Sequence, residues 1–98
     1  MYNKIILIGT VIQNVLSEDG GKSYITLETH SENGRRTQHD IWAAKKISEI
    51  SQKIAMPAAF VKVEGMLIYH QNGEAVILAH NISEMVPDPQ DIGAFDEG

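Results

Sequence analysis

The hydrophobic pattern of this chain changes period over residues 45–54, and that change limits the folds that it can adopt. Ile47, Ile50 and Ile54 lie at i, i+3 and i+7, which predicts one face of a short helix ending before Pro57. Strand-like patterns cover residues 3–13, 22–30, 36–44, 60–69 and 74–82. This order predicts an all-β fold, a five-stranded OB-fold barrel with one short helix between strands 3 and 4. A generic α+β sheet domain has the same order of elements.

Glycines and turn residues separate or interrupt the predicted strands. Asn33-Gly34 is typical of a type I′ hairpin turn, in which both central residues have positive φ, and Asn72-Gly73 predicts a second hairpin turn. We expect a bulge or bend at Gly9, inside the first strand. From Pro87 onward the periodicity is lost. We therefore expect an OB-fold domain over residues 1–86 and a disordered acidic tail over residues 87–98.

Composition excludes several classes of protein. The chain has no cysteine, which excludes disulfides and thiolate metal sites and suits a reducing cytosol. Its four histidines lack metal-ligand spacing, and no phosphate loop or nucleophile motif is present. The apolar run at residues 5–8 is too short for a signal peptide or a membrane span. We expect a cytoplasmic protein that is not an enzyme and has no metal, no cofactor and no membrane partner.

The net charge of −5 is concentrated at the carboxyl end. Residues 87–98 hold four acids and no base, so the remaining chain is close to neutral. A neutral domain binds a polyanion only if its charges are sorted onto one face.

Four stretches occur in a characteristic order: NKIILIG at 3–9, ITL at 25–27, KISEI at 46–50 and VKVEGML at 61–67. Over residues 2–86 their order and spacing resemble those of bacterial single-stranded-DNA-binding proteins. The related primosomal replication protein N (PriB) is similar at residues 9–11 and 63–65. The resemblance implies largely sequence-independent binding of single-stranded DNA, in DNA replication, recombination or repair. It also implies a homo-oligomer, either dimer or tetramer, with His39 near the subunit interface.

Alternation along the predicted strands identifies candidate DNA-binding residues. Ile41 belongs in the core, so Trp42 should point outward, where it can stack on a base; the alternative is a core or interface tryptophan. Tyr24 faces outward from the second strand, and Tyr69 lies late in the fourth. The cationic candidates for phosphate contacts are Arg35, Arg36, Lys22 and Lys62, with Lys62 expected beside the surface of Trp42. A solvated hairpin tip is the alternative for the two arginines.

The small number of aromatic residues and the near-neutral charge of residues 1–86 leave a second function open. In the resembling family, aromatic residues are common at positions that Gln38 and Ala44 occupy here, so the stacking surface is reduced. The alternative is an OB-fold that acts as a protein-interaction or primosome assembly factor with weak or no DNA binding. The tail resembles the family's acidic peptide that recruits replication and repair proteins. Its candidate contacts are Asp91, Ile92, Phe95 and Asp96, and the alternative is a solubilising tail.

Overall fold

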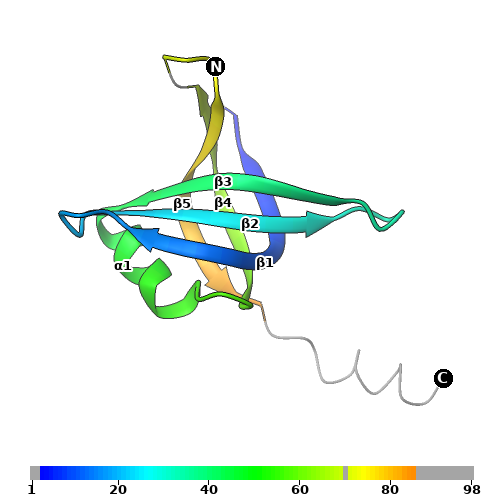
Figure 1. Ribbon diagram of the computed structural model, residues 1–98, viewed down its shortest axis with the longest axis horizontal. Coiled ribbons are helices and arrows are strands. Elements are labelled where there is room, and N and C mark those ends of the chain that lie inside the picture. Colours follow the sequence, from blue (N-terminus) through cyan, green and yellow to red (C-terminus); the bar gives the residue numbers. More distant parts are fainter. Residues whose placement is uncertain (1–2, 70, 86–98) are drawn as a thin grey trace.

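The computed structural model, which describes residues 3–69 and 71–85, is a closed five-stranded barrel with one helix (Figure 1). The elements are β1 (Ile5–Leu16), β2 (Lys22–His30), β3 (Arg36–Ala44), α1 (Lys45–Ile54), β4 (Phe60–Tyr69) and β5 (Ala75–Glu84). The strand order around the barrel is β1-β2-β3-β5-β4, with β4 pairing back onto β1. A short parallel pairing of β3 with β5, at Ile41–Ile77 and Trp42–Leu78, completes the closure. This confirms the predicted OB-fold and its order of elements.

The core follows from the period-2 alternation of the strands. Leu27, Ile41 and Val61 are fully buried, and Ile25, Ala43 and Val63 of the same strands are buried beside them. From α1, Ile47 and Ile54 pack against this core, whereas Ile50 is 39% exposed. The predicted stripe of three isoleucines is therefore wrong at Ile50.

The helix is also fixed to the barrel by a buried polar cluster. The Ser23 and Ser48 hydroxyls lie 2.6 Å apart and are both fully buried. The Gln52 side-chain amide donates to Ser23 Oγ at 2.9 Å and to Asn14 Oδ1 at 3.0 Å. Asn14 in turn donates to the carbonyl of Ala55 at 3.1 Å, where the helix ends. These bonds connect β1, β2 and α1, and satisfy polar groups that burial would otherwise leave unpaired.

The bulge of β1 does not lie at Gly9. Pairing with β4 is continuous from Ile5 to Thr10, and the register with β2 shifts between Val11 and Gln13. A Cβ at position 9 would lie 2.3 Å from the carbonyl oxygen of Glu28. The glycine is required because β2 approaches there, where β1 passes from β4 to β2. β1 runs on to Leu16, beyond the predicted end at residue 13.

The β2–β3 hairpin does not turn as predicted. Gly34 has φ 83°, but among the described non-glycine residues only Lys45 and Ala58 have positive φ, so Asn33 does not. A type I′ turn needs positive φ at both central positions, so the Asn33-Gly34 turn belongs to another class. The Gly34 amide donates to the Ser31 carbonyl at 2.9 Å, and the Ser31 amide donates to the carbonyl of Arg35. The hairpin projects well beyond the barrel (Figure 1).

No helix within the described residues is long and apolar enough to cross a membrane.

Candidate functional site

The outer face of the β1–β2–β3 sheet is built from three aligned rungs. The register places Val15, Tyr24 and Trp42 in one rung, then Gln13, Thr26 and Asp40, then Thr10, Glu28 and Gln38. Because side chains alternate along a strand, all of these face away from the core formed by Ile25, Leu27 and Ile41. The predicted outward orientation of Trp42 is confirmed.

Tyr24 and Trp42 form the aromatic centre of this face. They are directly opposite each other on β2 and β3, with ring centroids 5.7 Å apart and planes at 75°. Tyr24 is 38% exposed and Trp42 is half-buried. An edge-to-face pair of this kind favours a fixed orientation of both rings, so the surface is organised before any ligand arrives.

A hollow of about 250 Å³ lies against this pair. Besides Tyr24 and Trp42, its lining includes four side chains with hydrogen-bonding oxygens, Gln13, Thr26, Asp40 and Glu74. Asp40 and Glu74 were not among the residues predicted for the site. Asp40 belongs to β3, and Glu74 is the residue before β5. The two strands pair in the barrel, and neither strand's sequence alone predicts that pairing.

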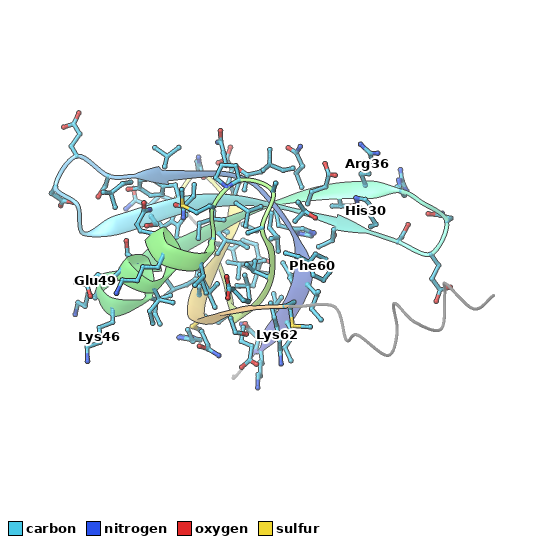
Figure 2. The ribbon with its side chains drawn as sticks, turned by 90° about the horizontal axis from the view of Figure 1, so that it is seen from below. His30, Arg36, Lys46, Glu49, Phe60 and Lys62 are labelled. Atoms are coloured by element: carbon cyan, nitrogen blue, oxygen red, sulfur yellow. The ribbon has the colours of Figure 1, made fainter. Side chains whose placement is uncertain are left out.

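Cations lie at both ends of the same face. Lys22, the first residue of β2, is exposed next to the aromatic rung. At the other end, Arg35 and Arg36 lie on the projecting hairpin, and the side chain of Arg36 is 72% exposed (Figure 2). Glu28 faces that end, with its Oε1 3.2 Å from His30 Nε2 and 4.0 Å from Arg36 Nε. The hairpin charge is therefore partly neutralised.

Lys62 and Tyr69 lie elsewhere. Lys62 faces outward from β4, but its neighbours across the sheet are Ile8 and Ser83, and its ammonium pairs with Glu64 at 3.1 Å. The row of Trp42 continues through Leu78 to Met66 instead, so the expectation that Lys62 lies beside Trp42 is wrong. Tyr69 ends β4, opposite Ala75, and is 71% exposed on the β4–β5 hairpin.

His39 is half-buried and hydrogen-bonds through Nε2 to Thr29 Oγ1 at 2.9 Å. Its role at a subunit interface remains a prediction. The tail candidates Asp91, Ile92, Phe95 and Asp96, and the domain boundary after residue 86, lie outside the described residues.

A second outward surface was missed by the sequence analysis. Ile6 and Ile8 of β1 and Phe60 of β4 are each between 44% and 51% exposed. Ile8 and Phe60 line a common hollow of about 190 Å³ with Glu28 and His30. The signal was present in residues 5–8, where an apolar residue at every position leaves both faces of the strand apolar. We name Ile6, Ile8 and Phe60 the β1–β4 patch.

The described residues contain no cluster of three or more histidine, cysteine or acidic side chains placed to hold a metal ion. No family model matches the sequence, and no curated protein matches it.

Solved structures of similar fold were found. A small single-stranded-DNA-binding protein from Mycoplasma pneumoniae is 16% identical with a TM-score of 0.68, over 90% of this chain and 99% of that one. A small single-stranded-DNA-binding protein from Streptomyces coelicolor is 18% identical with a TM-score of 0.70, over 86% and 94%. A deletion mutant of the single-stranded-DNA-binding protein from Thermus aquaticus is 18% identical with a TM-score of 0.72, over 89% and 42%. This chain therefore has the fold of bacterial single-stranded-DNA-binding proteins. These matches do not test the resemblance to primosomal replication protein N.

Proposed function

We propose that this protein is a non-catalytic module that binds single-stranded DNA on the outer face of the β1–β2–β3 sheet. The observation that carries the proposal is the arrangement of the Tyr24–Trp42 pair between Lys22 and the hairpin arginines. Bases stack on aromatic rings, and cations that follow the backbone contact its phosphates. The shared fold with the three single-stranded-DNA-binding proteins supports the same function.

The dimensions of the face suit a short stretch of DNA. Lys22 and His30 are the two ends of β2, so the face is about 26 Å long at roughly 3.3 Å per residue. A single OB-fold binds about 4–16 nucleotides. A protein of this function acts on DNA during replication, recombination or repair. In a bacterium the DNA is in the cytoplasm, so we propose that location for this protein.

The salt dependence of binding tests this proposal. The affinity for a labelled oligonucleotide of about 16 nucleotides is measured by fluorescence anisotropy between about 50 mM and about 200 mM salt. Each phosphate contact adds roughly −0.7 to the slope of log affinity against log salt concentration for single strands. Arg36→Ala should weaken binding and make the slope less negative by about that amount.

Lys46→Ala is the matched control, since Lys46 lies on α1, far from the hairpin (Figure 2). Equal effects of the two variants would contradict the proposed face. Absence of binding at low salt would favour the alternative, an assembly factor that does not bind DNA. The carboxylates of Glu28 and Asp40 on the same face favour that alternative, because they repel phosphates.

We further propose that the protein is a homo-oligomer in which a second copy covers the β1–β4 patch. The three side chains of the patch are large and apolar, and their exposure is of the kind that marks association surfaces. Ile8→Glu should reduce the molar mass measured by light scattering, while Ile50→Glu on α1 should leave it unchanged. A monomeric parent protein would contradict this part of the proposal.

The division into an OB-fold domain over residues 1–86 and a tail over residues 87–98 also belongs to this proposal. In it, Asp91, Ile92, Phe95 and Asp96 contact replication or repair proteins, because acidic side chains next to apolar ones suit a basic-rimmed apolar pocket. Deleting residues 87–98 should abolish such contacts and leave DNA binding in place. Loss of DNA binding on deletion would contradict this assignment.

A further inference from the structure

The hollow beside the Tyr24–Trp42 pair combines aromatic rings with hydrogen-bond acceptors. Asp40 is one rung along the sheet from Trp42 on the same outward face, next to Thr26. Glu74 reaches the hollow from the segment that enters β5. A base stacked on the rings would therefore have its edge among carboxylate oxygens.

The carboxylates of Asp40 and Glu74 differ from those of Glu28 and Glu64 on the same barrel. Glu28 is within 4.0 Å of His30 and Arg36, and Glu64 is within 4.0 Å of Lys4 and Lys62. In the part of the chain that the structure describes, Asp40 and Glu74 are in no such ion pair, and their carboxylate oxygens accept no hydrogen bond. Both are exposed. Their oxygens are thus available to a ligand.

Free carboxylates interact differently with the phosphates and with the bases of a nucleotide. They repel phosphates, so they do not serve the backbone. They accept hydrogen bonds from amino groups on base edges, as in the pairing of acidic side chains with the N4 amino group of cytosine. Thymine and uracil have a carbonyl oxygen in place of that amino group, and two acceptors facing each other are unfavourable.

We infer that this hollow is a base-recognition site that selects amino-bearing bases over thymine and uracil, with Asp40 and Glu74 as the acceptors. The inference rests on the proposed function and adds base selectivity to it. Stacking on the rings alone tolerates every base. The acceptors make binding at this one position dependent on the base.

The same rings and carboxylates would also suit the guanidinium group of a protein partner. The cations at the two ends of the face, Lys22 and Arg36, favour the DNA strand, because they would repel a basic peptide lying along it.

Affinities for oligo-deoxycytidine and oligo-deoxyuridine of equal length test the inference. Cytosine has an amino group where uracil has a carbonyl oxygen, and the two bases also differ at the neighbouring ring nitrogen. Neither base has the methyl group of thymine. The cytosine oligomer should bind about fivefold tighter or more. Asp40→Asn and Glu74→Gln should each raise affinity for both oligomers, because a negative charge is lost, and should bring the two affinities closer together.

Glu49→Gln on α1 is the control for charge alone, and it should leave the ratio of the two affinities unchanged. Equal affinities in the parent protein, or a ratio unaffected by both site variants, would overturn the inference and leave the proposed function in place. If neither oligomer binds but an oligoarginine peptide does, both the inference and the proposed function fail.

Discussion

Tyr24 and Trp42 lie opposite each other on β2 and β3, with their ring centroids 5.7 Å apart and their planes at 75°. Neither strand alone contains this pair; the β2–β3 register creates it. The arrangement holds the single tryptophan of the chain at a defined angle on the sheet surface. Much of the proposed DNA binding depends on this one contact.

Removing the tyrosine ring should weaken binding of single-stranded DNA. Tyr24→Leu removes one stacking surface and the support of Trp42, so the binding free energy should become less favourable by about 1–3 kcal/mol. Tyr24→Phe keeps the ring and should bind within about twofold of the parent protein. Anisotropy titrations of both variants measure the difference. If Tyr24→Leu and Tyr24→Phe bind equally well, the ring takes no part.

Adding one methyl group at Gly9 should destabilise the barrel. The Cβ of Gly9→Ala would lie 2.3 Å from the Glu28 carbonyl oxygen, so β1 and β2 would have to separate. The free energy of unfolding in urea should fall by about 2–3 kcal/mol. Gly21→Ala is the control, because its Cβ would lie 3.4 Å or more from its nearest neighbours in Asp19. Equal stability of the two variants would show that the strands can separate at Gly9 without cost.

The buried hydroxyl pair under α1 should be coupled. Ser23→Ala or Ser48→Ala leaves a buried partner short of one hydrogen bond, at a cost of about 1–3 kcal/mol in unfolding free energy. The double variant should cost less than the sum of the two. Urea unfolding of all four proteins measures the coupling. Strict additivity would mean that the two hydroxyls do not interact.

The β1–β2 turn should lose stability in acid. The Ser17 hydroxyl, at 2.7 Å, and the Gly21 amide, at 2.9 Å, donate to Asp19 Oδ1 and lower the pKa of that carboxyl below 3.8. A carboxyl with a lowered folded-state pKa stabilises the fold above its unfolded pKa and loses that effect as the pH falls through the folded one. An NMR titration should therefore place the Asp19 inflection below 3.8. Asp19→Asn should remove the corresponding pH dependence of stability; an inflection above 3.8 would contradict this account.

Periodicity in the sequence was sufficient for most of the barrel. The bounds of β2, β3, α1 and β4 agree with those predicted, because each has a run of alternating or helical apolar positions that ends at a turn. The outward face of Trp42 followed from Ile41 in the same way. The need for a glycine at position 9 depended instead on a distant segment, the approach of β2. The type of the Asn33-Gly34 turn was a local failure, because the dipeptide does not fix a positive φ at Asn33.

The candidate site was predicted less completely for the same reason. Strand alternation gave Tyr24 and Trp42, but the neighbours of a residue across the sheet depend on register. Lys62 pairs with Glu64 away from Trp42, and Asp40 and Glu74 line the same hollow because β3 pairs with β5. Which charged side chains lie near the Tyr24 and Trp42 rings therefore depends on how the strands pair in the barrel.

The fluorescence of Trp42 during titration with oligo-deoxycytidine tests the central claim most directly, since no other tryptophan is present. Stacking of a base on the indole should quench its emission, and the quenching should follow the same binding curve as anisotropy of the labelled oligonucleotide. Added salt should reverse both signals together. Binding seen by anisotropy with no change in tryptophan emission would place the DNA on a different surface and contradict the account.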